Sequence, residues 1–164
     1  MAHLLYDTMS PPRYAAEAIR SGFSAPRMNA RSVARWNDAP VSNLADALER
    51  SIGGGVFATF APSLALTDAL IHQQDIRRPL NRPRDIPTAR LLTVLDHPDP
   101  FTSPRRRTRG LRFTATDVGW SHGDGPEVRG TGEAIAMAIH GRAAALADLD
   151  GDGTDVLRAR LNGG

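Results

Sequence analysis

Residues 63–77 read Ser-Leu-Ala-Leu-Thr-Asp-Ala-Leu-Ile-His-Gln-Gln-Asp-Ile-Arg, a stretch without glycine or proline. Most of these residue types have a high helix propensity, so the stretch predicts the best-formed helix of the chain. Its apolar positions Leu66, Leu70 and Ile71 recur at helical spacing and are expected to face a core. Pro79 is expected to end the helix, because proline disfavours the helical conformation in the residue before it.

Helical patterns also occupy most of the sequence on either side of this stretch. Five further helical segments are expected before residue 97: 1–10, 11–21, 26–36, 41–52 and 86–95. The segment 96–110 contains three prolines and an arginine run, and it is expected to be a loop or linker.

The pattern changes after this linker. Residues 110–117 alternate apolar and polar side chains, which is typical of a strand, and residues 127–130 form a second strand candidate. Residues 122–126 have the composition of a turn, so the two strands are expected to pair as a hairpin. Two short helices are expected after it, over 132–140 and 152–161.

The expected fold class is therefore α+β and mostly helical. The order of the elements predicts two domains, a helical domain over residues 1–97 and a small C-terminal unit of a β-hairpin and helices over 108–164. A chain of 164 residues is long enough to bury a core without disulfides or a structural metal.

The composition excludes several kinds of chemistry. The chain contains no cysteine and no lysine, so all 20 of its cationic side chains are arginines. It cannot supply a thiolate nucleophile, a cysteine ligand for zinc or a lysine Schiff base. Any thiol that takes part in its chemistry must come from another molecule.

Neither a membrane nor a nucleic acid is an expected partner. No apolar run reaches about 18 residues, and the N-terminus lacks the basic region of a secretory signal, so a cytoplasmic protein is expected. The arginine run at 105–109 has no interleaved aromatic residues for base stacking and is expected to be a solvated loop. Nucleic-acid binding through this run is the weaker alternative.

The most informative pair of polar residues lies inside the helix at 63–77. Asp68 and His72 are four positions apart, which places both side chains on one face of a helix, where they could reach the same ion. Such pairs are more often simple surface pairs, so this spacing leaves both interpretations open. His3, in another expected helix, is a third candidate ligand.

Three segments of the chain resemble the mycothiol-dependent maleylpyruvate isomerase-like family, which belongs to the DinB-like metal-binding helical bundles. The segments are 1–4, 66–80 and 110–130, and the most specific pieces are His-Gln-Gln-Asp-Ile-Arg-Arg-Pro-Leu at 72–80 and the segment 117–130. Members of this family begin with a further helix. The present chain starts inside what corresponds to the second helix, so the first helix is expected to be missing.

The resemblance implies a divalent metal ion, usually zinc, and a small-molecule thiol, mycothiol. It places the metal ligands at His3, Asp68 and His72, where the family more often has glutamate at the acidic position. Three protein ligands and a water molecule are typical of a catalytic zinc site. Such a metal ion could lower the pKa of a bound thiol, so that the thiol attacks as a thiolate.

The expected function is therefore a thiol-dependent isomerase or thiol transferase that binds an acidic substrate. The alternative is a degenerate, non-catalytic DinB-like module for binding or interaction. A chain without the first helix would expose apolar surface, which a homodimer could cover.

Three further residues near the end of the helix at 63–77 are candidates for the same site. Asp75 could hold the other ring nitrogen of a ligand histidine, or it could cap the helix end or pair with Arg78. Arg77 and Arg78 could bind a carboxylate of the substrate or cofactor, because a guanidinium group matches a carboxylate in geometry. Both arginines could instead be solvated residues at a helix end.

Overall fold

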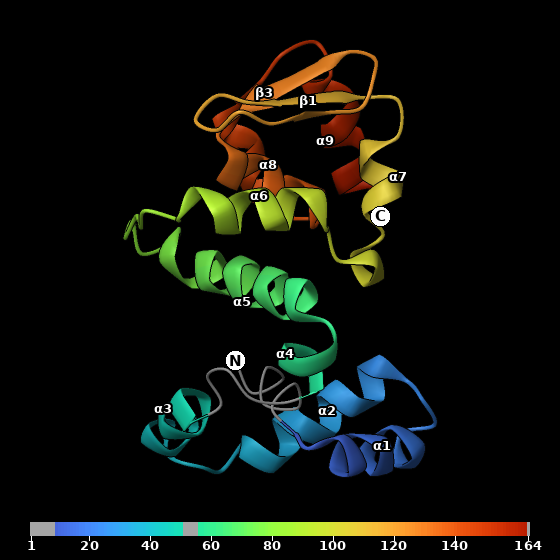
Figure 1. Ribbon diagram of the computed structural model, residues 1–164, viewed down its shortest axis with the longest axis vertical. Coiled ribbons are helices and arrows are strands. Elements are labelled where there is room, and N and C mark those ends of the chain that lie inside the picture. Colours follow the sequence, from blue (N-terminus) through green and yellow to red (C-terminus); the bar gives the residue numbers. More distant parts are fainter. Residues whose placement is uncertain (1–8, 51–55, 164) are drawn as a thin grey trace. The chain divides into compact units, whose positions relative to one another are not determined.

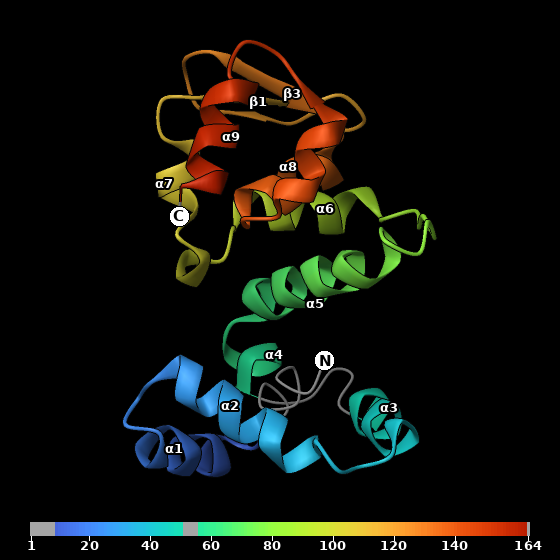
Figure 2. The same ribbon diagram turned by 180° about the vertical axis from the view of Figure 1, so that it is seen from behind.

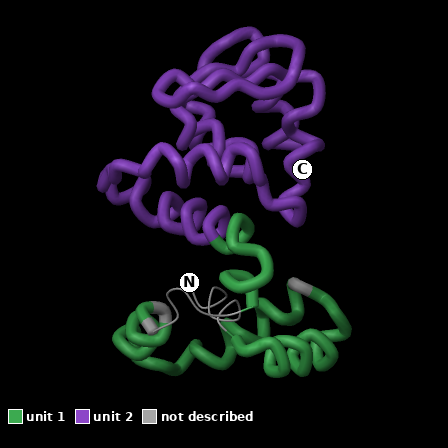
Figure 3. Tube along the Cα trace, in the orientation of Figure 1, with its two compact units in different colours: residues 1–65 green, residues 66–164 purple. Residues whose placement is uncertain are grey.

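The computed structural model describes residues 9–50 and 56–163. The chain divides into two compact units, residues 1–65 and 66–164 (Figure 3). In the described parts the fold is mostly helical with one small sheet, which confirms the α+β class.

The first unit is entirely helical where it is described. Its helices are α1 (Pro11–Arg20), α2 (Ala25–Trp36), α3 (Val41–Arg50), α4 (Val56–Phe60) and the start of α5 (Pro62–Arg77). Two of them lie within the predicted stretches 11–21 and 41–52, and α2 begins one residue before the predicted stretch 26–36. The segment predicted at 1–10 lies almost wholly outside the described residues. The short α4 was not expected, because valine, phenylalanine and threonine are weak helix formers.

Charge and aromatic contacts join the helices of the first unit. Glu17 on α1 is buried, and its carboxylate accepts a hydrogen bond from Arg31 on α2, with Arg35 3.7 Å away. Tyr14 on α1 meets Phe57 on α4 edge to face, with 5.6 Å between the ring centroids. A carboxylate and an aromatic ring therefore connect α1 to both neighbouring helices.

The second unit contains the sheet and the main hydrophobic core. After α5 its elements are α6 (Thr88–Asp96), the 3₁₀ helix η2 (Pro100–Thr102), α7 (Pro104–Thr108), β1 (Arg112–Ala115), β2 (Ser121–His122), β3 (Glu127–Gly130), α8 (Gly132–Ile139), the 3₁₀ helix η3 (Ala143–Asp148), β4 (Leu149–Asp150) and α9 (Thr154–Asn162). Helices α8 and α9 lie on the same side of the sheet, and α6 packs against α8 (Figures 1 and 2).

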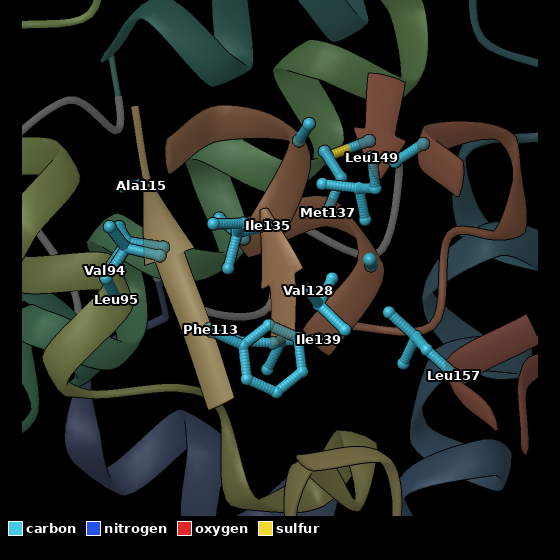
Figure 4. Packing of buried hydrophobic residues seen from close by; sticks show 14 of the residues in the cluster. Val94, Leu95, Phe113, Ala115, Val128, Ile135, Met137, Ile139, Leu149 and Leu157 are labelled. Atoms are coloured by element: carbon cyan, nitrogen blue, oxygen red, sulfur yellow. The ribbon is translucent and has the colours of Figure 1, made fainter. Parts of the chain in front are cut away.

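The core forms where α8 meets the sheet. Phe113 on β1 and Val128 on β3 are fully buried, as is Ile135 on α8 (Figure 4). Leu91 and Val94 of α6 belong to the same cluster. The predicted domain boundary, between residues 97 and 108, therefore differs from the observed division between 65 and 66, because the apolar face of α6 is buried in the C-terminal core.

The sheet corrects the predicted hairpin. Its strand order is β2-β1-β3-β4, and β1 pairs with β3 in parallel, with Phe113 opposite Val128. The antiparallel neighbour of β1 is the two-residue strand β2, whose second residue, His122, was predicted to begin a turn. The chain then crosses the start of β1 through Gly123 and Gly125, both with positive φ. A Cβ atom at Gly123 would lie 2.3 Å from the Leu111 carbonyl oxygen, so only glycine permits this crossing.

The arginine run is also more ordered than the expected loop. It forms α7, in which the Arg107 guanidinium donates to the carbonyl oxygens of Thr102 and Ile139. Arg160 of α9 donates to the carbonyl oxygens of Arg107 and Arg109. Arg107 and Arg160 therefore connect elements of the second unit through hydrogen bonds to backbone carbonyl groups.

Candidate metal site on helix α5

Helix α5 has one buried face, which carries both apolar and polar residues, and a partly exposed strip beside it. Leu70 and Ile71 are buried in the core, as predicted from the sequence, and Thr67 and Gln74 are buried beside them. Asp68 and His72 remain partly exposed on the neighbouring strip. The helix thus holds these two polar side chains on a rigid support at the edge of the core.

Asp68 and His72 approach each other closely. The Asp68 Oδ1 atom lies 3.2 Å from His72 Nε2, and their side chains are 28% and 25% exposed. Two ligands bound to one tetrahedral zinc ion at about 2.05 Å would be about 3.4 Å apart. The pair predicted from the four-residue spacing therefore has nearly the separation that a shared metal ion requires.

The second nitrogen of the His72 ring faces another carboxylate. His72 Nδ1 lies 3.2 Å from the Oδ2 atom of Asp75, which is 33% exposed. A neutral imidazole has one N–H group, so it can donate to one of the two carboxylates and presents a lone pair to the other. Both contacts are attractive only when a further cation, either a second proton or a metal ion, is bound.

Asp75 is itself held by Arg142, which follows α8. The guanidinium donates from Nη2 to Oδ2 at 2.8 Å and from Nε to Oδ1 at 3.1 Å. Burial alone would raise the pKa of the Asp75 carboxyl, but the hydrogen bonds and charge of Arg142, together with His72, lower it below the usual range. Asp75 is therefore an ionised carboxylate that can accept from Nδ1 of His72 when that nitrogen carries the proton.

Sequence reasoning assigned no role to Arg142. The residue comes directly after Gly141, whose φ is +91°, and its Nη1 atom donates to the His140 carbonyl oxygen at 2.8 Å. A glycine at the end of a helix is a recognisable signal for a change of chain direction. The partner of the arginine lies 67 positions away in the chain, and no local pattern identifies it.

Arg78 forms contacts different from those expected for a substrate-binding residue. Its guanidinium donates from Nε to Glu133 Oε1 at 2.8 Å, from Nη2 to Glu133 Oε2, and from Nη1 to Asp148 Oδ2 at 2.7 Å. The hydrogen bonds to Glu133, with those to Asp148, raise its pKa further above the usual arginine value. This arginine joins the end of α5 to α8 and η3.

The neighbouring Arg77 lacks such partners. Its Nε atom is buried and has no hydrogen-bond acceptor among the described residues. Arg77 and Arg78 both line a pocket of about 590 Å³ within the second unit. The two arginines that the sequence presents as equivalent candidates therefore have different environments.

The described part of the chain supplies two of the three predicted metal ligands. His3 lies outside the described residues, so its position relative to Asp68 and His72 is not part of the structure. Among the described residues, no group of three or more His, Asp or Glu side chains is arranged to hold a metal ion. The Asp68–His72 pair therefore needs a further ligand from elsewhere.

Comparisons with models of protein families, with curated proteins and with solved structures found no match to this chain. Within residues 9–50 and 56–163, no helix combines the length and apolar character needed to cross a membrane.

Proposed function

We propose that this chain is a DinB-like protein that binds a divalent metal ion, best matched by zinc, through Asp68 and His72, with His3 as the third ligand. The contact between Asp68 Oδ1 and His72 Nε2 carries the proposal, because a carboxylate oxygen and an imidazole nitrogen 3.2 Å apart can bind the same cation when that nitrogen presents its lone pair. The resemblance to the mycothiol-dependent isomerases gives the same pair of residues independently of this distance.

In this proposal Asp75 and Arg142 hold the His72 ring in the orientation that a metal ligand needs. Asp75 accepts from Nδ1–H of His72 and so leaves the Nε2 lone pair directed toward the site. Arg142 fixes the orientation of the Asp75 carboxylate through three hydrogen bonds. Such outer contacts set the tautomer and ring orientation of a ligand histidine.

The proposed reaction is a thiol-dependent isomerisation or thiol transfer. A bound divalent ion would supply Lewis acidity that favours the thiolate form of a bound thiol. The chain contains no cysteine, so the thiol must come from a soluble molecule, for which mycothiol is the candidate given by the resemblance. The alternative is a degenerate, non-catalytic DinB-like module for binding or interaction.

Metal analysis of the full chain tests the proposed metal site. Protein purified without chelator is expected to contain about one zinc ion per chain by mass spectrometry, and His72→Ala or Asp68→Ala should remove it. His122→Ala is the matched control, because His122 is exposed on β2 and contacts the ring of Trp120. A wild-type protein without metal that also fails to bind added zinc would overturn the proposal.

Activity is tested separately on the zinc-loaded chain. Mycothiol-dependent isomerisation of maleylpyruvate should occur with the wild type and be lost in His72→Ala. A zinc-loaded protein without thiol-dependent activity would support the non-catalytic module.

A further inference from the structure

A second candidate site lies at the C-terminal end of α5, in the pocket of about 590 Å³. This volume is within the range of pockets that hold small molecules, about 300–1,000 Å³. The pocket is lined by the end of α5, the loop that follows it, the turn after β1, the first turn of α8 and the end of η3. All of these elements belong to the second unit.

The turn after α5 brings arginines together at this pocket. The Arg82 N–H group donates to the Arg77 carbonyl oxygen, and the Asn81 N–H group donates to the Arg78 carbonyl oxygen, both at 3.0 Å. With Asn81 at φ +49°, this pattern is a Schellman turn. The backbone of Arg82 therefore returns to the last turn of α5, and Arg84 follows two residues later.

Three of these arginines have no carboxylate partner within the described parts of the chain. Arg78 is bound by Glu133 and Asp148, but no ion pair involves Arg77, Arg82 or Arg84. Arg84 donates only to the neutral side chain of Gln73, at 2.7 Å. The pocket is thus bordered by three guanidinium groups that are free to donate hydrogen bonds to an anionic ligand.

The guanidinium group of Arg77 has a nitrogen without a hydrogen-bond acceptor among the described residues. Its Nε atom is buried without a hydrogen bond, and a buried charged donor is costly when it lacks a partner. A carboxylate is a suitable partner, because its two oxygens match the two parallel N–H groups of a guanidinium. The Nε atom is closed to solvent, so a ligand carboxylate in the pocket would pair with the terminal N–H groups of Arg77, which lines the pocket and is only partly buried.

The remaining lining limits the rest of the ligand. Asp85, Asp117 and Thr131 also line the pocket, and one oxygen of Asp117 already accepts from the Gly132 N–H group at 2.7 Å. These acidic residues disfavour a ligand of high negative charge, and their free oxygens favour hydroxyl groups. The lining therefore suits one carboxylate on a hydroxyl-rich body.

We infer that this pocket is a binding site for a small hydroxy carboxylate, whose carboxylate is held by Arg77 with Arg82 and Arg84. The inference does not depend on the metal site, since none of the pocket residues used here is a proposed metal ligand. The sequence predicts that Arg77 and Arg78 bind a carboxylate. In this inference Arg77 binds it, and Arg78 holds the pocket wall in place through Glu133 and Asp148.

The experiment is a calorimetric titration of the full chain with three probes: D-gluconate, D-sorbitol and inorganic phosphate. Sorbitol has the same hydroxyl-rich chain as gluconate without the carboxylate, and phosphate is an oxyanion without the chain. Gluconate is expected to bind saturably and more tightly than either. Repeating the titration with chelator and with added zinc should leave its affinity unchanged.

Variants identify the residues that bind the probe. Arg77→Gln and Arg82→Gln should each weaken gluconate binding about tenfold, the loss expected for one charge-assisted contact. Arg112→Gln is the matched control, because Arg112 is an exposed arginine on β1 that does not line the pocket. Because Arg82 is an exposed loop residue, its variant tests the site even when Arg77→Gln does not fold.

Three results would overturn the inference. These are the absence of saturable gluconate binding, unchanged affinity in Arg82→Gln, and equal or tighter binding of sorbitol. Tighter binding of phosphate than of gluconate would overturn the assignment to a hydroxy carboxylate.

Discussion

The Asp75 carboxylate on α5 receives three hydrogen bonds from the guanidinium of Arg142, which lies 67 residues later in the chain. The same carboxylate lies 3.2 Å from Nδ1 of His72. This contact therefore connects the segment after α8 to the proposed metal ligand on α5.

Replacing Arg142 is expected to weaken both the fold and the site. Arg142→Gln should lower the free energy of unfolding by about 1–2 kcal/mol, since the pair is partly exposed. It should lower zinc affinity about ten- to hundredfold, because the histidine loses its fixed acceptor. Denaturant unfolding and zinc titration measure the two effects. Arg142→Lys keeps the charge without the two parallel donors, and full zinc affinity in that variant would show that charge alone suffices.

The Arg78–Glu133 pair is expected to contribute to stability. A double-mutant cycle of Arg78→Gln and Glu133→Gln should give a coupling energy of about 1–2 kcal/mol, because the contact uses two parallel hydrogen bonds. Chemical denaturation of the four proteins measures it. A coupling energy close to zero would show that the guanidinium relies on Asp148 alone.

Folding stability should fall in mild acid because of His140. This residue is buried, and its ring accepts from the Asp99 N–H group at 3.0 Å and lies 2.7 Å from the Ala136 carbonyl oxygen. Burial lowers the pKa of His140 below its usual value, since nearby acceptors offset the loss of hydration only in part. The unfolded chain therefore binds a proton at about pH 6.5, where the folded chain does not.

The contribution of His140 is thus fully present above about pH 6.5 and is lost as the pH falls through its lower folded pKa. Denaturant unfolding between neutral and mildly acidic pH measures this loss against His140→Asn. The stability difference between wild type and variant should shrink as the pH falls. A difference that stays constant or grows would contradict the prediction.

The loop that crosses β1 should tolerate only glycine at two positions. Gly125→Ala places a Cβ atom 2.5 Å from the Gly110 carbonyl oxygen at a φ of +123°. It should therefore destabilise the protein by more than about 2 kcal/mol. Gly119→Ala is the control, because a Cβ atom there meets nothing within 4 Å. Thermal unfolding compares the two, and equal melting temperatures would argue against the crossing.

The sequence allowed α5 and its pair of polar residues to be predicted because both depend on local spacing. Asp68 and His72 are one helical turn apart, so the helix alone brings them together. The partner of Asp75 could not be found in this way, because its position depends on how α8 packs. The same holds for Arg78, whose acidic partners come from two other elements.

The strand topology was mispredicted for a different reason. Glycine and aspartate at 123–125 favour a tight turn as well as a close crossing, and the local pattern does not separate the two. The parallel pairing of β1 with β3 follows from tertiary packing against α8. The turn at Asn81 carries a local signal, since asparagine tolerates a positive φ at a helix end, and this signal could have indicated the pocket.

Zinc titration of the full chain, stripped with chelator, tests the central claim most directly. Calorimetry of the wild type should show about one site per chain, with binding abolished by His72→Ala, strongly weakened by Asp68→Ala and unchanged by His122→Ala. A wild type that binds no zinc, or a His72→Ala variant that binds it as tightly as the wild type, would contradict the account.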